Sequence, residues 1–178
     1  ILLLIQYSIS TVFAFSTEYA TTKYIELTKI IVFALLTTAM VNTEDRVKWA
    51  FRITLSTIGI LSLRSFIGII LTGGGRVYGP GGQYEDNNDY ATLLNLAWPM
   101  ILFLGRSENV KWRKLLFYGM TATSIITVLF TYSRGGFLGL CAATIALALK
   151  SRYKAAGLAG VLLAGVLFFS FAPAEVLQ

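Results

Sequence analysis

The sequence predicts an all-α fold, a polytopic bundle of transmembrane helices. Of its 178 residues, 56% are apolar and only 13% are charged, and the mean hydropathy is +0.68. Soluble domains are usually about 45–50% apolar and about 25% charged. The apolar residues gather in continuous blocks instead of alternating as they do in porin strands. We therefore expect one transmembrane domain over residues 1–178.

Each apolar block is a candidate membrane span, because about 20 mostly apolar residues cross a bilayer as a helix. Small residues inside these blocks, as in the run AAGLAGVLLAG, are typical of helices that pack closely in lipid. The first block is expected to be truncated, and Pro99 is the only proline in the middle of a candidate helix. The seven candidates are residues 1–15, 24–41, 53–71, 90–104, 115–132, 136–149 and 155–171.

The connections between these blocks alternate in charge. Residues 44–52, 105–114 and 150–154 hold most of the fifteen lysines and arginines. Cytoplasmic loops of membrane proteins carry this excess of basic residues. We therefore expect these three connections in the cytoplasm. The remaining connections, including an extracytoplasmic loop at residues 72–89, are then expected on the outer face.

This outer loop reads LTGGGRVYGPGGQYEDNNDYA from residue 71 to residue 91. Its glycines permit positive φ angles and a close approach of backbone to a ligand. Arg76 supplies a planar, permanently charged group that suits phosphate or carboxylate. Just before the next helix lie Glu85, Asp86, Asn87, Asn88 and Asp89, which could also cap it. The candidate ligand-binding residues of the loop are Tyr78, Asp86, Asn87 and Asn88, with Arg76. The alternative is a flexible loop without a ligand.

A second arginine is expected on the outer face, in the run TYSRGG at residues 131–136. Arg134 occupies the shortest connection, against the usual bias of basic residues toward the cytoplasm. Gly135 would let a ligand approach it, and Ser133 is a candidate cap for the following helix. The alternative is an arginine that snorkels to the membrane surface.

Three charged residues lie inside candidate spans. Glu26 and Lys29 are one helical turn apart, and we expect them to pair. Arg64 is central in the block 53–71. Ionisable groups within a membrane usually face a polar interior. For Arg64, a role in a binding site and a structural role both remain open.

Several classes of site are not expected. The chain has no histidine and a single cysteine, Cys141, which leaves neither a Cys/His zinc site nor an internal disulfide. The loop matches neither GxxxxGK[ST] nor GxGxxG, which argues against a nucleotide. The net charge of +6 follows the expected topology better than it suggests a nucleic-acid partner. We expect no metal and no cofactor.

Two outward arginines and a polar loop suit a substrate that carries its own leaving group. A lipid-linked diphospho-sugar is such a substrate. Its transfer needs cations for the charge that develops on the diphosphate, a base for the acceptor hydroxyl and a groove for the polyprenyl tail.

RVYGPGGQYEDNNDYA and YSRGG together resemble the two arginine motifs of the O-antigen ligase and polymerase superfamily. They resemble in particular the O-glycosylation ligases associated with exosortase-type sorting systems, where GGGRVYGP, DNN and SRG follow in this order. The resemblance runs from about residue 19 to the C-terminus. It implies that Arg76 and Arg134 bind the undecaprenyl diphosphate of the donor and that Asn88 lies at the rim of that site.

The resemblance also implies the activity and its place. A glycan would pass from a polyprenyl-diphosphate carrier to a lipid, polysaccharide or protein acceptor on the periplasmic face of a bacterial inner membrane. Ligase and polymerase remain open. The related ligases use a histidine in a long outward loop, and we expect this chain to be a fragment that stops at the start of that loop, at residues 172–178. Glu85 and Asp86 are the alternative candidates for the base.

Two other functions remain open. A transporter or flippase for an anionic lipid or solute would also use Arg64, Glu26 and Lys29, although the inverted repeats or broken helices typical of transporters are not evident. A scaffold subunit would use the outer loop to bind a partner.

Overall fold

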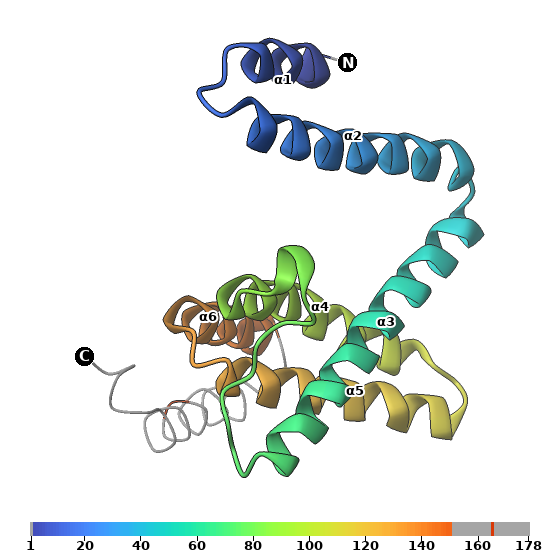
Figure 1. Cartoon of the computed structure of the whole chain (residues 1–178). Coiled ribbons are helices and arrows are strands. Elements are labelled where there is room, and N and C mark those ends of the chain that lie inside the picture. The colour runs from blue at the N-terminus through green and yellow to red at the C-terminus, as the bar shows by residue number, and fades with distance from the viewer. Residues whose placement is uncertain (1, 151–164, 166–178) are drawn as a thin grey trace. The chain divides into compact units, whose positions relative to one another are not determined.

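The part of the chain that the structure describes consists of helices and the connections between them. The computed structural model describes residues 2–150 and residue 165. It contains six α-helices and one short 3₁₀ helix, and no strand lies within the described residues. The all-α prediction is confirmed. The chain divides into two compact units, unit 1 (residues 1–51) and unit 2 (residues 52–178), and the boundary falls within the third helix (Figure 1).

Unit 1 contains α1 (Leu2–Val12), α2 (Thr17–Met40) and the start of α3 (Glu44–Leu71). The hydroxyl of Ser8 donates to that of Tyr24 at 3.0 Å and joins α1 to α2. No residue of α2 is buried.

The expected pairing of Glu26 with Lys29 is wrong. Glu26 instead accepts from Lys23 at 2.9 Å, one turn earlier on α2. Lys23 and Lys29 each lie three residues from Glu26, a spacing that allows an ion pair on a helix. The ammonium of Lys23 also lies 5.8 Å from the centre of the Tyr19 ring, and this second contact favours Lys23 as the partner.

Unit 2 contains the rest of α3, the 3₁₀ helix η1 (Gly82–Tyr84), α4 (Asn87–Ser107), α5 (Lys111–Phe130) and α6 (Arg134–Lys150). Each expected span from residue 1 to residue 149 contains a helix, and several helices begin earlier than expected. Residues 44–52 are the first turns of α3 rather than a loop, because the acidic Glu44 and Asp45 suit a helix start. The candidate span 155–171 lies outside the described residues.

The expectation of seven membrane spans is not supported. By length and composition, α3 is the one described helix that is long and apolar enough to cross a membrane. α1 and α6 have 11 and 17 residues, and a spanning helix usually has about 20. Charged and hydroxyl side chains lower the hydropathy of α2 and α5.

α4 packs against α5 and α6, and α3 crosses α5 (Figure 1). The fully buried side chains at the centre include Tyr90, Leu94 and Ile101, all on α4. At the crossing, the buried hydroxyl of Ser62 lies 3.1 Å from that of Thr123. A Cβ atom at Gly59 would lie 2.6 Å from the sulfur of Met120, so a larger residue here would require the Met120 side chain to move.

A similar approach joins α4 to α6. A Cβ atom at Gly136 would lie 2.6 Å from the Cβ atom of Ala91. The amide of Asn95 donates to the Gly136 carbonyl at 2.7 Å. Gly135 and Gly139 form a small-xxx-small spacing of the kind that lets membrane helices pack closely.

The connections of unit 2 gather at two different ends. At one end, Arg52 near the start of α3 pairs at 2.9 Å with Glu108, which follows α4 and is 8% exposed. At the other end, which we call the loop end, residues 72–86 meet residues 130–133 between α5 and α6. The two described connections of unit 2 that are expected on the outer face, residues 72–89 and 133–135, thus share the loop end.

The close contact of α4 with α6 predicts the effect of Gly136→Ala. The added methyl group would strike Ala91, and overpacking of this kind costs about 1–3 kcal/mol. We expect a lower midpoint of thermal unfolding for the full-length protein in detergent. Gly119→Ala is the control, because nothing lies within 4 Å of a Cβ atom at Gly119 on α5. Alanine is more favourable than glycine in a helix interior, so Gly119→Ala should not lower the stability. An equal loss of stability in both variants would contradict the packing described.

Candidate functional site

The loop end is organised around the last carbonyl groups of α5. The backbone N–H of Val77 donates to the Phe130 carbonyl at 2.9 Å. The Nε atom of Arg76 donates to the Thr131 carbonyl at 3.2 Å, and the side-chain amide of Asn87 donates to the same oxygen at 2.8 Å. The long loop and the start of α4 are therefore both tied to one buried carbonyl, since Thr131 is fully buried.

These contacts have a simple physical cause. The last carbonyl groups of a helix have no partner within the helix, and they form the negative end of its dipole. A cationic donor such as Arg76 suits this position. Only Nε of the guanidinium makes this bond. The side chain is exposed, and its guanidinium carbon lies 5.7 Å from the centre of the Tyr78 ring.

A second set of contacts joins the start of α4 to the start of α6. The hydroxyl of Ser133 donates to the side-chain oxygen of Asn88 at 2.7 Å and accepts from the backbone N–H of Gly136 at 3.0 Å. The expected cap of α6 by Ser133 is confirmed. Among the residues 85–89 that could cap α4, Asp86 does so by accepting from the backbone N–H of Asn88 at 2.7 Å, and a cap by Asn88 or Asp89 is wrong.

Arg134 is the first residue of α6, and its side chain is exposed. A helix N-terminus carries a partial positive charge that disfavours a cation but favours an anion. Arg134 and the N-terminus of α6 therefore add to one positive potential. Gly135 lies beside this position, where a Cβ atom would come within 3.0 Å of the Asn88 side-chain oxygen.

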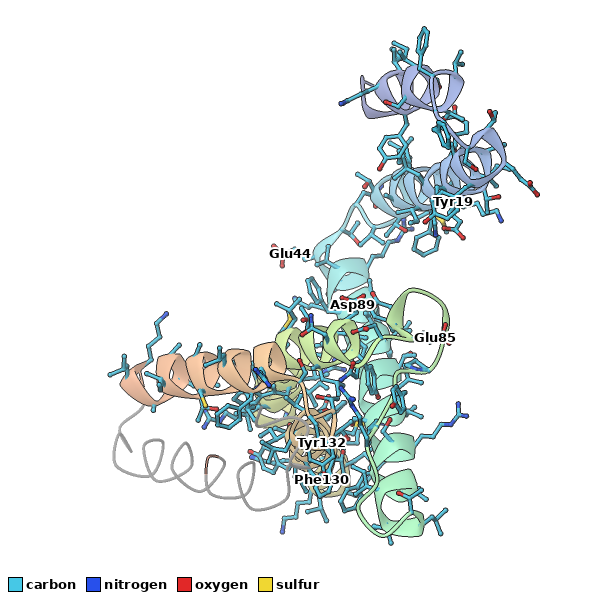
Figure 2. The ribbon with its side chains drawn as sticks, turned by 60° about the vertical axis from the view of Figure 1, so that its left-hand side comes forward. Tyr19, Glu44, Glu85, Asp89, Phe130 and Tyr132 are labelled. Atoms are coloured by element: carbon cyan, nitrogen blue, oxygen red, sulfur yellow. The ribbon has the colours of Figure 1, made fainter. Side chains whose placement is uncertain are left out.

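The turn between α5 and α6 contains a strained residue. Tyr132 has a φ angle of 51°, a value that residues other than glycine rarely adopt. Its ring is buried, lies 6.0 Å from the ring of Phe130 (Figure 2) and carries a hydroxyl that donates to the Gly74 carbonyl at 3.3 Å. Strain of this kind persists where the surrounding contacts enforce it. Here the contact with Gly74 joins the turn to the loop.

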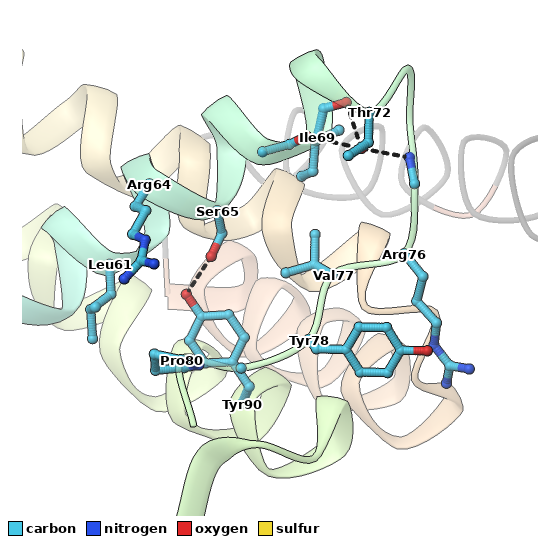
Figure 3. A pocket seen from close by; sticks show the side chains of 13 residues that line it. Leu61, Arg64, Ser65, Ile69, Thr72, Arg76, Val77, Tyr78, Pro80 and Tyr90 are labelled. Carbon is cyan, nitrogen blue, oxygen red and sulfur yellow. Dashed lines mark hydrogen bonds between the residues drawn. The ribbon is translucent and has the colours of Figure 1, made fainter. Parts of the chain in front are cut away.

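A cavity of about 240 Å³ lies between the last turns of α3 and the loop (Figure 3). Small-molecule pockets begin at about 300 Å³, so this volume suits a compact headgroup. Figure 3 shows Arg64 at one end of the cavity and Arg76 with Tyr78 at the other. Between them, the hydroxyls of Ser65 and Tyr90 share a hydrogen bond of 2.9 Å. The other lining residues are Leu61, Gly68, Ile69, Thr72, Gly75, Val77, Gly79 and Pro80.

Arg64 is the unusual member of this cavity. It belongs to the one helix that could cross a membrane, and its side chain shares an exposed stripe of α3 with Ile60 and Ile67. No carboxylate pairs with it within the described part of the chain. If α3 crosses a membrane, a charge at this position is costly without compensation and makes Arg64 a candidate for a functional site. An anion in the cavity would compensate it.

The predicted site residues therefore form two neighbouring groups. The loop end brings together Arg76, Asp86, Asn87, Asn88, Ser133, Arg134 and Gly135. Arg64 and Tyr78 line the cavity with Arg76, whereas Arg134 does not line it. Sequence reasoning missed the Thr131 carbonyl, Tyr132 and the Ser65–Tyr90 pair. A backbone carbonyl and a strained tyrosine leave no signal in the sequence, and the pair depends on how α3 crosses α4.

The residues that the structure describes include no cluster of three His, Cys, Asp or Glu side chains that could hold a metal. Comparisons of the chain with protein-family models, with curated proteins and with solved structures found no match.

The shared carbonyl predicts the effect of Asn87→Ala. The variant loses one hydrogen bond to the Thr131 oxygen, worth about 1 kcal/mol, and loosens the loop from α5. We expect faster hydrogen exchange at the backbone amide of Val77. Asn109→Ala, at an exposed position between α4 and α5, should leave that rate unchanged. Exchange of Val77 that is equally slow in both variants would show that Asn87 does not hold the loop.

Proposed function

We propose that this chain forms the donor-binding part of a membrane glycan transferase of the O-antigen ligase and polymerase type. One observation carries the proposal: the segments of Arg76 and Arg134, both expected on the outer face, meet at the C-terminal turn of α5. They are far apart in the sequence, and hydrogen bonds to Thr131 and Ser133 hold them together. Their proximity supports a diphosphate clamp, which needs two cations near one site.

In the proposed reaction, the donor is a glycan on a polyprenyl diphosphate. An acceptor oxygen bonds to the anomeric carbon while the bond from that carbon to the diphosphate oxygen breaks, with inversion. The diphosphate leaves with the electron pair, and the acceptor proton passes to a base. Arg76 and Arg134 stabilise the charge that develops on the diphosphate. Asp86 is engaged as a helix cap, which leaves Glu85 as the more accessible carboxylate near this site.

The cavity of Arg64 and Arg76 supports a place for the charged headgroup. Its wall on α3 belongs to a helix that is apolar enough to cross a membrane. A polyprenyl tail could then follow the exposed apolar stripe of α3 that contains Ile60 and Ile67. Arg64 would compensate a phosphate from within the membrane, where the attraction between opposite charges is strong.

We also propose a multi-pass topology with the loop end on the outer face. The separation of the two ends of unit 2 supports it, because Arg52 and the basic start of α5 lie away from the loop. Large apolar side chains remain exposed on α2, α3 and α4, as expected for helices in lipid. A transporter is less well supported, since transporters typically use discontinuous helices and α3 and α4 are continuous over 28 and 21 residues.

The clamp predicts that Arg134→Ala and Arg76→Ala abolish glycan transfer by the full-length protein. Loss of one such donor to developing charge costs about 10²–10³ in rate. Arg134→Lys should also be poor, because an ammonium cannot replace a planar guanidinium fork. The readout is transferred glycan relative to the amount of protein in the membrane. Near-normal transfer by Arg134→Ala at normal protein levels would contradict the assignment.

The cavity predicts direct binding of a short isoprenoid diphosphate. Full-length protein in nanodiscs should bind farnesyl diphosphate more tightly than farnesol. Arg64→Gln and Arg76→Gln should each weaken that binding by about tenfold or more, as expected when a hydrogen bond to a charged group is lost. Arg113→Gln is the control, since Arg113 is exposed near the start of α5. Equal affinity for the diphosphate and the alcohol would exclude the cavity as a diphosphate site.

A further inference from the structure

A second hollow lies at the start of α4. It is an open groove of about 600 Å³, lined by Tyr84, Asp89, Thr92, Leu93 and Leu96. Its volume falls within the range of about 300–1,000 Å³ that is usual for small-molecule sites. Figure 2 shows where Asp89 lies, at the start of α4, with Glu85 on the loop before it. None of these five residues lines the cavity of Arg64 and Arg76.

The lining of the groove suits a polyol. Asp89 accepts hydrogen bonds from hydroxyl groups, and it is the charged residue among those that line the groove. The hydroxyl of Thr92 donates to the Asn88 carbonyl at 2.9 Å, which leaves its oxygen able to accept. The ring of Tyr84, 40% exposed, offers an apolar face for the C–H groups of a sugar.

The groove and the neighbouring cavity differ in charge. Two arginines line the cavity, whereas a carboxylate lines the groove. A diphosphate is attracted to the cavity and repelled by Asp89. The groove therefore favours an uncharged ligand, or one that carries an amine.

Consecutive residues of the chain line the cavity and the groove. Asp89 lines the groove and the next residue, Tyr90, lines the cavity. On the loop, a Cβ atom at Gly79 would lie 1.3 Å from the carbonyl oxygen of Tyr84. The cavity wall at Gly79 thus touches the groove wall at Tyr84. A ligand in the groove would lie next to one in the cavity.

We propose that the groove of Tyr84, Asp89, Thr92, Leu93 and Leu96 binds the acceptor, as a neutral, hydroxyl-rich glycan. This inference rests on the proposed function and adds the acceptor side to it. Tyr84 stacks on a sugar ring, and Asp89 and Thr92 accept from its hydroxyls. Leu93 and Leu96 cover its apolar face. Asp89 and Tyr84 are binding residues in this account, and the donor diphosphate lies at the arginines, outside the groove.

The test is direct binding of neutral oligosaccharides, without the donor. The probe is an array of glucose-, galactose-, mannose- and N-acetylhexosamine-based oligosaccharides, presented to full-length protein in nanodiscs. Wild type should bind at least one of these classes. Tyr84→Ala and Asp89→Asn should each weaken that binding by about tenfold or more, the change expected for a lost hydrogen bond to a charged group or a lost aromatic contact. Absence of binding by wild type, or equal binding by Asp89→Asn, would overturn the proposal.

Matched controls lie in unit 1. Tyr19→Ala removes an exposed tyrosine of α2, and Asp45→Asn neutralises an exposed carboxylate at the start of α3. Both should bind the same oligosaccharides as wild type. Asp89→Asn keeps the size of the side chain, so it still tests the groove if Tyr84→Ala fails to fold. Farnesyl diphosphate serves as the independent probe: if its binding still depends on Arg76 while no oligosaccharide binds, the groove proposal fails and the donor site stands.

Discussion

The loop end depends on the carbonyl groups that α5 leaves open at its C-terminus. Helix ends expose such groups because no following turn donates to them. Here the Phe130 carbonyl accepts from the backbone of Val77, and the Thr131 carbonyl accepts from Arg76 and Asn87. A buried carbonyl without a donor would cost about 1–3 kcal/mol. The same bonds that satisfy these carbonyls therefore fix the loop and place the guanidinium of Arg76.

This arrangement places two hollows beside one short segment. Tyr90 and Asp89 are consecutive residues, yet one lines a basic cavity and the other lines an acidic groove. The fully buried Tyr90 holds the start of α4 in place, and its hydroxyl bonds to Ser65 of α3. Gly79 permits the loop to pass close to Tyr84 and Tyr90. A transferase needs its donor and acceptor sites to be distinct but adjacent, and this segment can provide both.

The sequence predicted the all-α class and most helix positions, because apolar blocks and helix-forming runs are local signals. It also predicted that the segments of Arg76 and Arg134 share an end, because charge alternates between connections. It did not predict that α3 begins at Glu44, since a dense run of charges resembles a loop. It left the cap of α4 open among residues 85–89, because EDNND offers several equivalent caps. Tertiary contacts of Asn87 and Asn88 with Thr131 and Ser133 decide in favour of Asp86. The cavity beside Arg64 depends on the crossing of α3 over its neighbours, which no local pattern encodes.

The most direct test of this account is the side of the membrane on which each end of unit 2 lies. In the full-length protein with Cys141→Ser, single cysteines would replace Glu85 at the loop end and Ser107 at the end of α4, both exposed. A membrane-impermeant maleimide applied to spheroplasts should label the cysteine at 85 at once. It should label the cysteine at 107 only after the membrane is opened. Labelling of both positions from outside, or of position 107 alone, would contradict an outward-facing site for the two arginines.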